Sequence, residues 1–291
     1  MKHAYLILAH GDFELLQCLV SALDDERNDL YIHVDKKVKA LPSLTVQKSQ
    51  LYLIDERIDV RWGSVRMLEA EFALLRAATS RDSYQYYHLI SGADLPLKSQ
   101  DEIHAFFSAH QGQEFIGYSQ YDYSKEVMRK VHRYHLFDDH FKGKGLSFFL
   151  MKATRYLFIK IQELVGWKRH RNIEFKKGTQ WVSITHQLAQ FLLSKERETL
   201  KIYQGTFCCD EIMVQTWAWH EPRFRVAIFD THNEGHGCMR HINWRGNQLP
   251  DFTIQDLPAL QSSSALWARK FSSKEHELIA TLLEELNNSP H

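Results

Sequence analysis

The stretch Tyr86–Ile90, with the turn that follows it, constrains the fold of this chain more than any other segment. Its five residues are aromatic or apolar apart from one histidine, which is typical of a short buried strand. A Ser-Gly pair ends the strand, Asp94 follows, and Pro96 prevents a simple continuation. The pattern predicts a strand that delivers a carboxylate at its C-terminal end.

A helix is predicted directly after this turn. Ser99 and Glu102 have the spacing of a capping box, in which each side chain satisfies a backbone N–H of the other. A strand, a carboxylate and a helix in this order build the ligand crevice of open α/β sheets. A turn in which Asp94 only caps its own backbone is an equally good interpretation.

The first 110 residues repeat this alternation. Strands are expected at 2–9, 30–35 and 51–54, and helices are expected after Asp12 and Ser64, each of which is suited to cap a helix. Alternating strands and helices of these lengths predict an α/β fold with a parallel, Rossmann-like sheet flanked by helices. Neither a Gly-x-Gly-x-x-Gly turn nor a phosphate-binding loop is present, so a nucleotide would be held by other means.

The second part of the chain has a looser pattern. Expected elements are strands at 114–117, 178–185, 224–229 and 241–244, helices at 186–203, from 212 and at 272–287, and a loop at 246–264. Lys125, Arg129 and Arg133 would share one helix face, either as a solvated surface or as a local basic site. With 291 residues the chain suits a single domain, with a nucleotide-binding half at 1–110 and an acceptor and catalytic half at 111–291.

Residues 146–167 form an apolar, aromatic and amphipathic segment. Its charges, Lys152, Arg155, Lys160 and Glu163, exclude a membrane span. Two interpretations stay open: a helix buried in the core, or a helix that lies in a membrane interface.

Composition excludes several classes of protein. The chain has 36 basic and 36 acidic residues, so no overall field attracts nucleic acid, and any basic site must be local. Four scattered cysteines do not form a disulfide framework and indicate a reducing compartment. The apolar run at the N-terminus is too short for a signal peptide.

Carboxylates at the ends of elements are the first candidates for chemistry. Asp35, Asp94 and Glu211 are placed in this way, and Asp210 adjoins Glu211 at the expected start of a helix. A positioned Glu211 would suit a general base, although a helix-capping role would use the same position. No Asp-x-Asp triplet occurs, so the usual carboxylate pair that holds Mg²⁺ or Mn²⁺ on a sugar nucleotide is missing.

Cations are the second group of candidates. Arg240 follows a glycine-rich stretch, and Arg269 and Lys270 lie between aromatic residues. Such cations can neutralise a leaving diphosphate in place of a metal, while an exposed dibasic pair is the structural alternative for Arg269 and Lys270.

A third group is loosely zinc-like. Four potential ligands crowd into ten residues: His232, His236, Cys238 and His241. A zinc-dependent hydrolase is therefore one alternative, and a histidine-rich loop is another. No Gly-x-Ser-x-Gly elbow occurs.

Together these segments resemble the core-2/I-branching enzymes, a family of β-1,6-N-acetylglucosaminyltransferases and peptide O-xylosyltransferases. The resemblance runs from residue 3 to about 272 and rests on the following segments: Ala4–His10, Tyr31–Lys37, Trp62–Ser64, His88–Lys98, Gly178–Trp181, Cys209–Glu211 and Leu266–Phe271. It implies a GT-A-like glycosyltransferase fold, inverting chemistry and no metal cofactor.

The resemblance also implies roles for individual residues. Glu211 matches the general base, Arg240 and Lys270 match the diphosphate-binding cations, and Asp35 and His10 fall where uridine is contacted. Asp94 takes the place of the metal-binding carboxylates of related folds, and Trp181 would line the sugar site. Asp210 and Arg269, next to these positions, are expected to contact substrate.

The expected function is the transfer of a sugar, GlcNAc first, from a UDP-sugar donor to a hydroxyl of a glycan acceptor. Animal members of the family are membrane-anchored and rich in disulfides. This chain lacks both features, which favours a bacterial enzyme in the cytoplasm or peripheral at the inner face of the membrane, with a surface polysaccharide or a lipid-linked acceptor. A UDP-xylose-dependent enzyme and a non-catalytic carbohydrate- or nucleotide-binding protein are the alternatives. The weakest resemblance lies at 114–176, where the acceptor would bind.

Overall fold

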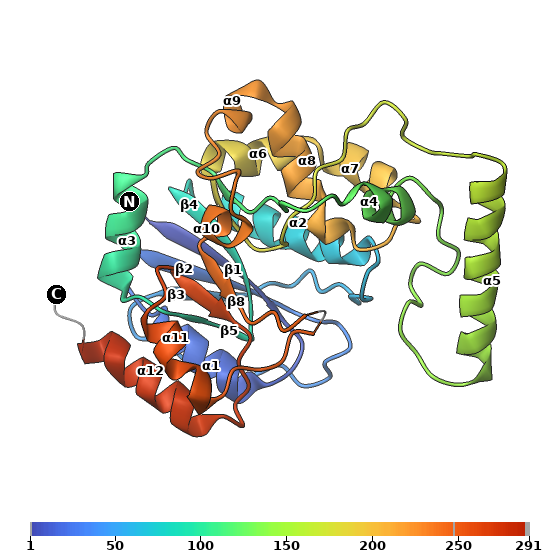
Figure 1. Cartoon of the computed structure of the whole chain (residues 1–291). Helices are drawn as coiled ribbons and strands as arrows, with labels where there is room; N and C mark the ends of the chain where they lie inside the picture. Colours follow the sequence, from blue (N-terminus) through green and yellow to red (C-terminus); the bar gives the residue numbers. More distant parts are fainter. Residues whose placement is uncertain (1, 247, 289–291) are drawn as a thin grey trace.

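A computed structural model describes residues 2–246 and 248–288 (Figure 1). Its main sheet has six strands in the order β3-β2-β1-β4-β7-β6. The strands are β1 (His3–Ala9), β2 (Asn28–Val34), β3 (Gln50–Leu53), β4 (Tyr86–Ser91), β6 (Phe115–Ile116) and β7 (Val182–Thr185). The four N-terminal strands are parallel, as predicted, whereas β7 is antiparallel to both β4 and β6. The sheet is therefore mixed, and both parts of the chain contribute strands to it.

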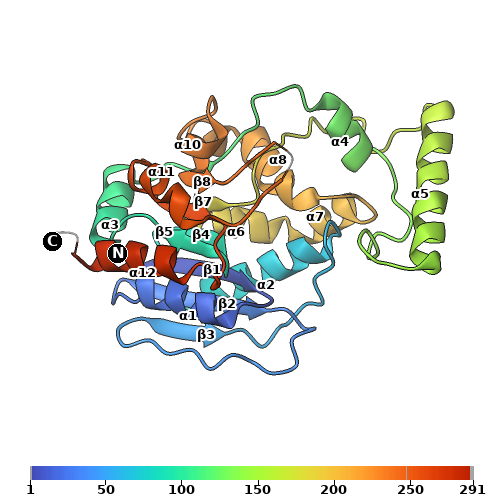
Figure 2. The same ribbon diagram turned by 60° about the horizontal axis from the view of Figure 1, so that its bottom comes forward.

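Central strand β1 is buried along its whole length because helices cover both faces of the sheet. Successive side chains of a strand point to opposite faces, and here Leu6 belongs to one apolar core while Tyr5 belongs to the other. Helix α2 (Arg66–Thr79) packs with Leu6, and α1 (Phe13–Ala22) packs with Tyr5. Figure 2 shows α1 and α2 on opposite sides of the strands.

A second sheet of three short strands stands beside the first, in the order β5-β9-β8. Its strands are β5 (Asp94–Pro96), β8 (Arg240–Ile242) and β9 (Trp267–Arg269). Strand β5 follows β4 after one turn, so the small sheet lies at the carboxyl end of β4. Its register sets Asp94 opposite Arg269 and thereby joins two distant candidate residues.

The remaining elements are mostly helical. They are α3 (Gln100–Ala109), α4 (Ser124–Lys130), α5 (Leu146–Leu164), α6 (His186–Ser194), α7 (Glu196–Tyr203), the 3₁₀ turn η1 (Cys209–Glu211), α8 (Met213–His220), α9 (Pro222–Arg225), α10 (Glu234–Cys238), η2 (Ile254–Asp256), α11 (Leu257–Gln261) and α12 (His276–Asn288). The capping box predicted for Ser99 and Glu102 is present at the start of α3. Asp12 caps α1 through a hydrogen bond from the backbone N–H of Leu15.

Several predicted boundaries were wrong. Helix α2 begins one residue later than expected, after Val65, but the Ser64 hydroxyl still accepts from the backbone N–H of Arg66 at 3.3 Å, as a cap would. The expected helix at 186–203 is two helices, and the expected strand at 224–229 begins inside α9. The expected loop at 246–264 contains η2 and α11.

Two further expectations about helices were also wrong. Helix α12 begins at His276 instead of Ser272, whose hydroxyl accepts from the backbone of Lys274 in a preceding turn. The basic face at 125–133 does not form, because α4 ends at Lys130 and Arg133 is buried beyond it.

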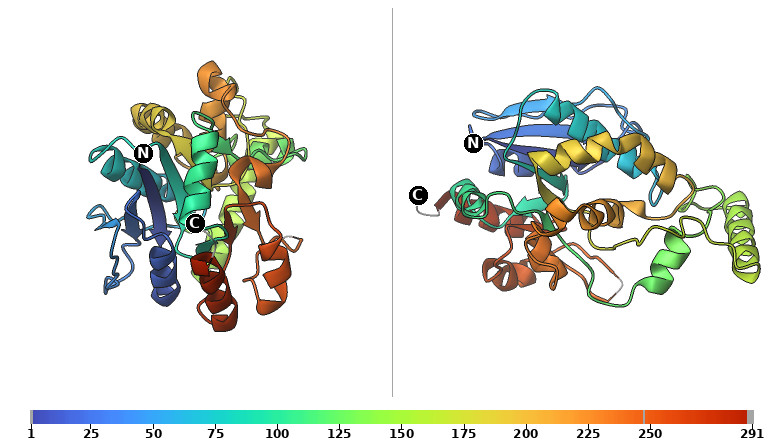
Figure 3. Two further views of the ribbon diagram at one scale, coloured as in Figure 1. Left: turned by 90° about the vertical axis from the view of Figure 1, so that its left-hand side faces the viewer. Right: turned by 90° about the horizontal axis from the view of Figure 1, so that it is seen from above.

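The apolar segment at 146–167 contains a single helix, α5, that stands away from the two sheets (Figures 1 and 2). Figure 3 shows the same separation from above. Only Arg155, Ile159 and Gln162 of the helix are buried, so the interpretation as a buried core helix was wrong. Within the described residues, no helix is long and apolar enough to cross a bilayer.

Candidate active site

The carboxyl ends of β1 and β2 bring His10 and Asp35 together, as expected for parallel neighbours. The Asp35 backbone N–H donates to the Ala9 carbonyl over 2.8 Å. His10 is exposed and Asp35 is buried. The Asp35 carboxylate accepts from the backbone N–H of Lys37 at 2.8 Å and from its ammonium at 2.7 Å. A ligand at this edge would therefore meet a carboxylate that Lys37 already holds in place.

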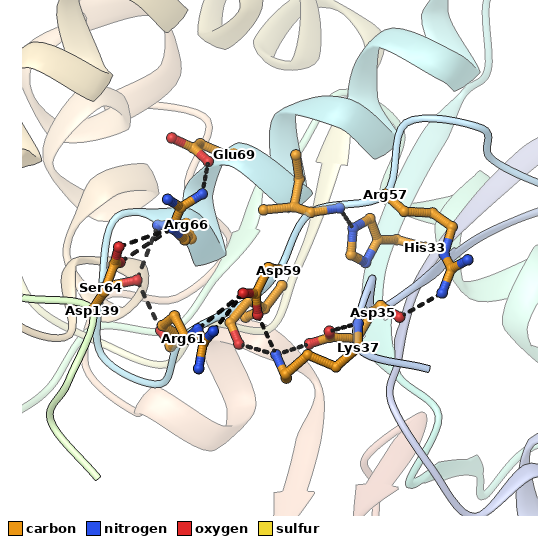
Figure 4. Close-up of polar contacts among 12 residues, drawn as sticks. His33, Asp35, Lys37, Arg57, Asp59, Arg61, Ser64, Arg66, Glu69 and Asp139 are labelled. Atoms are coloured by element: carbon orange, nitrogen blue, oxygen red, sulfur yellow. Dashed lines mark hydrogen bonds and ion pairs between the residues drawn. The ribbon is translucent and has the colours of Figure 1, made fainter. Parts of the chain in front are cut away.

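A chain of polar contacts continues from Asp35 along the rim of the sheet (Figure 4). The Lys37 ammonium also donates to Asp59 at 2.9 Å, and Asp59 in turn accepts from Arg61 at 2.6 Å. Farther along, Arg66 pairs with Asp139 at 3.2 Å. Ser64 links the two parts, because it donates to the Arg61 carbonyl and accepts from the Arg66 N–H. Polar contacts thus connect the Asp35 edge of the sheet to the segment that leads into α5.

Asp94, Arg269 and Trp181 form the second group of candidate residues. Asp94 accepts from the backbone N–H of Ser91 at 3.1 Å and from its hydroxyl at 2.7 Å. The turn-capping interpretation is therefore correct, although Asp94 also lies 3.8 Å from the Arg269 guanidinium. That guanidinium stacks on the Trp181 ring, 3.9 Å from its centroid.

The Arg269 guanidinium keeps unused donors. Its Nε and Nη1 are buried and make no hydrogen bond with any described residue. Burial lowers the pKa of Arg269, and the nearby Asp94 carboxylate opposes that effect. A buried cation with free N–H groups is well suited to bind an anionic group that displaces water.

Arg240 and Lys270, which the sequence paired as diphosphate-binding cations, have different environments. Arg240 is buried, stacks 3.9 Å from the Trp267 ring centroid and donates to the Cys238 carbonyl. The Lys270 side chain is 38% exposed and lies 3.4 Å from Asp251. Lys270 is therefore open to a ligand, whereas the Arg240 side chain is enclosed by Trp267 of β9 and by Ser183 of β7, to whose hydroxyl it donates at 3.3 Å.

Glu211 lies at the centre of a third group. It ends η1, just before α8, so it occupies the expected helix start. One Oε accepts from the Lys130 ammonium at 2.6 Å, and the Lys177 ammonium is 3.6 Å away. The side chain keeps 34% of its surface exposed. Glu211 is thus a half-exposed carboxylate that two nearly buried lysines hold in one orientation.

Two further carboxylates lie near Glu211: Glu71 is buried, and Asp210 is half-buried with one enclosed oxygen. Burial and the charge of Glu211 raise the pKa of Asp210, and burial together with the charge of Asp210 raises the pKa of Glu71. The Gln180 amide donates to Glu71 at 2.7 Å. Within this acidic cluster Glu211 is the carboxylate that lies next to solvent and to the lysines.

The segment Gly178–Trp181 connects the second and third groups. Gly178 donates its backbone N–H to the Glu211 carbonyl at 2.9 Å, and Trp181, three residues later, carries the Arg269 guanidinium. A Cβ at Gly178 would lie 1.8 Å from the Gly117 carbonyl oxygen, so only glycine allows this approach.

Lys130 and Lys177 are the residues that sequence reasoning missed. Lys130 lies between Arg129 and Arg133, in the stretch predicted to be either a solvated surface or a local basic site, and no sequence pattern indicates Lys177. One available signal was the spacing of Glu126 and Lys130, which lie four residues apart on α4 and pair at 2.7 Å. Nothing in the local sequence linked either lysine to Glu211.

The histidine-rich segment does not assemble a zinc site. His236 pairs with Asp230 at 2.7 Å, His241 bonds Ser263 at 3.1 Å, and Cys238 is buried. Among residues 2–246 and 248–288, no three His, Cys, Asp or Glu side chains are grouped to hold a metal ion. The structure therefore does not support the zinc-dependent hydrolase alternative, because its four proposed ligands do not come together.

Comparison with known proteins gives one family. The model of the Core-2/I-Branching enzyme family matches residues 3–262. Xylosyltransferase 2 of Rattus norvegicus is 23% identical, and the alignment covers 98% of this chain and 33% of the relative. Xylosyltransferase oxt of Drosophila pseudoobscura pseudoobscura is 20% identical over 100% of this chain and 34% of the relative.

A second kind of relative is aligned over more of its length. The N-acetyllactosaminide beta-1,6-N-acetylglucosaminyl-transferase of Mus musculus is 24% identical, with 97% of this chain and 71% of the relative covered. By contrast, this chain spans about a third of the length of the xylosyltransferases.

Proposed function

Because the chain belongs to the core-2/I-branching enzyme family, whose members are glycosyltransferases of GT-A-like fold, we propose that it is an inverting glycosyltransferase. It transfers GlcNAc from UDP-GlcNAc to a hydroxyl of a glycan acceptor and forms a β-linkage. The observation that carries this proposal is the position of Glu211, a half-exposed carboxylate that Lys130 holds beside Asp210.

In the proposed reaction Glu211 is the general base. The acceptor oxygen forms a bond to the anomeric carbon as the bond from that carbon to the β-phosphate oxygen breaks. Glu211 takes the proton of the attacking hydroxyl, and UDP leaves with the electron pair. Attack from the face opposite the diphosphate inverts the configuration of the sugar.

Lys270 and Arg269 are proposed to stabilise the departing diphosphate, and Arg240 supports the strand pair that carries them. Developing negative charge on the leaving group is stabilised by preorganised cations. Lys270 is exposed beside Asp251, and Arg269 has buried N–H groups without a described partner. With these cations, and without an Asp-x-Asp triplet, the reaction is proposed to need no metal.

The donor site is proposed to extend from the Asp35 edge to Trp181. Asp35 and His10 would contact the uridine, Asp94 would hold Arg269 in place, and Trp181 would pack against the sugar. Asp210, next to Glu211, would support the base and the acceptor side of the site.

The test is UDP release from a panel of UDP-sugars with glycan acceptors. Release from UDP-GlcNAc that requires an acceptor is expected. UDP-xylose is the second donor to test, because some of the relatives are xylosyltransferases. Tight UDP binding without release from any donor would instead favour a non-catalytic carbohydrate- or nucleotide-binding protein.

We also propose that the acceptor is a lipid-linked glycan used for a bacterial surface polysaccharide or glycolipid. The enzyme would then work in the cytoplasm, at the inner face of the membrane. Exposed apolar side chains on α5 support this part of the proposal.

A further inference from the structure

Helix α5 presents an apolar face to solvent instead of to the protein. Six large residues on it are between 49% and 88% exposed: Leu146, Phe149, Leu150, Leu157, Ile161 and Leu164. Apart from the adjacent pair Phe149 and Leu150, they follow one another at three or four residues once the exposed Ala153 is included, which places all of them along one side of the helix. The apolar stripe thus extends over the whole length of α5.

The opposite side of α5 fixes it to the rest of the chain. The Arg155 guanidinium donates to the carbonyls of Leu136, Phe137 and His140 at 2.7 to 2.9 Å. Gln162 accepts from the Tyr134 N–H at 2.9 Å and donates to its carbonyl at 3.0 Å. These polar contacts, on side chains that lie about half a turn from the stripe, determine which side of α5 faces outward.

Charge is concentrated around the same helix. The segment 142–171 contains eight basic residues and one acidic residue in a chain whose overall formal charge is zero. Four of the lysines, Lys142, Lys144, Lys152 and Lys160, are exposed, and the single carboxylate, Glu163, pairs with Lys160 at 2.7 Å. Lys160 is thus compensated by its own helix, whereas Lys142, Lys144 and Lys152 have no carboxylate partner among the described residues and leave positive charge near the apolar stripe.

We propose that this face of α5 docks on an anionic lipid bilayer. The helix would lie in the plane of the interface, with its leucines among the acyl chains and its lysines at the lipid phosphates. A second copy of the chain fits less well, because pairing two such stripes would bring two strongly basic segments together. The proposed lipid-linked acceptor would explain why the enzyme docks on a membrane, and in that respect this inference rests on the proposed function. The docking itself can be measured without any acceptor.

The position of α5 relative to the active site supports the assignment. The segment that leads from α4 to α5 contacts the loop before Glu211, because the Phe141 and Phe207 rings lie 4.5 Å apart. The Lys142 ammonium lies over the Trp62 ring, 4.0 Å from its centroid. The linker that holds α5 is thus packed against the loop that carries the candidate base.

The experiment is co-sedimentation of the full chain with vesicles of phosphatidylcholine alone or with added phosphatidylglycerol. Binding to the anionic vesicles, weakened by salt, is expected. The double variant Leu150→Glu/Leu157→Glu should reduce the partition coefficient at least about tenfold. Val226→Glu is the matched control, because Val226 is an apolar residue 85% exposed outside α5 and should not affect binding.

Three results would overturn the proposal. The first is the absence of binding to anionic vesicles, and the second is equal binding to neutral and anionic vesicles. The third is a parent protein that does not bind vesicles but self-associates, with the self-association abolished by Leu150→Glu/Leu157→Glu. Thermal unfolding and UDP release in solution check that the double variant is folded. Vesicle binding without UDP release from any donor would refute the proposed function and leave the docking surface intact.

Discussion

The Lys130 ammonium lies 2.6 Å from one oxygen of Glu211 and 2.7 Å from one oxygen of Glu126. One nearly buried lysine thus binds two carboxylates, one in the candidate active site and one on its own helix. Burial disfavours the charge of Lys130, but the charge of Glu211 and the hydrogen bond that the ammonium donates to Glu126 raise the pKa of this lysine. The pair Glu211 and Glu126 therefore offers a matched test of the catalytic assignment.

Glu211→Gln should lower kcat by roughly 10²–10⁴-fold, because the amide keeps the shape of the side chain but cannot accept the acceptor proton. The affinity for UDP should stay close to that of the parent, since the base faces the acceptor hydroxyl. Both quantities are measured on protein shown to be folded by thermal unfolding.

Glu126→Gln is the control for this change. It removes an ion pair to the same lysine but no candidate base, so kcat should fall by less than about tenfold. If the two variants lost the same activity, Glu211 would act only through Lys130. If Glu211→Gln kept the parental kcat, Glu211 would not be the general base, and Asp210 and Asp94 would be the next candidates.

Lys130→Met should lower the free energy of unfolding by about 1–3 kcal/mol, because Glu211 and Glu126 would lose a hydrogen-bonded, nearly buried partner. The folded pKa of this lysine is raised, so its stabilisation is complete at neutral pH and is lost only as the pH rises above about 10.5. Urea unfolding at pH 7 measures the change. A variant as stable as the parent would show that the ion pairs make no net contribution.

Lys270→Ala should weaken UDP binding and slow turnover, because the departing diphosphate would lose a cation. Lys270→Arg should recover only part of both, since a guanidinium differs from an ammonium in shape. Asp251→Asn removes the carboxylate 3.4 Å from Lys270 and should not weaken UDP binding. Parental UDP affinity and turnover in Lys270→Ala would exclude Lys270 from the donor site.

Turnover should survive EDTA, because the proposed site relies on Arg269 and Lys270 to neutralise the diphosphate. The measurement is UDP release before and after chelation, with Mn²⁺ added back. Loss of activity on chelation with recovery in Mn²⁺ would require a metal site that the present assignment lacks.

Acid should destabilise the protein through buried histidines. His3 and His104 stack with ring centroids 4.1 Å apart, and burial lowers the pKa of His104 to about 4 and that of His3 to about 2. Their unfolded pKa is about 6.5, so stability is complete above that pH and falls as the pH drops toward the folded values.

The contribution of one histidine can be isolated by substitution. Between pH 6.5 and 4, each such histidine removes less than about 1.4 kcal/mol per pH unit from the free energy of unfolding. His104→Gln should therefore lose less stability than the parent between pH 7 and 5, as measured by urea unfolding. An identical loss in both proteins would contradict the assignment.

Much of the main sheet could be predicted from local sequence. Strands β1 and β4 and the cap of α3 depend on patterns within about ten residues, and these patterns are visible in the local sequence. Helix ends were less predictable, because α2 begins after Val65 and α12 at His276, each past its expected start, and terminal turns vary by one or more residues.

The candidate site was predicted in part. Motifs indicated Glu211, Asp94 and Arg269, and the register of β5 and β9 brings the last two together. The environment of Arg240 was not predictable, since its burial under Trp267 depends on how two strands distant in sequence pack.

The sequence by itself determined the family, the alternation of elements in the first half of the chain and the types of residue available for chemistry, because these depend on local patterns and motif order. Only the tertiary structure decided that Lys130 and Lys177 hold Glu211 and that the apolar side of α5 faces outward. Ion pairs between distant residues and the outward face of a helix follow from the packing of separate elements. A helical period shows that α5 has two sides, but not which of them the protein covers.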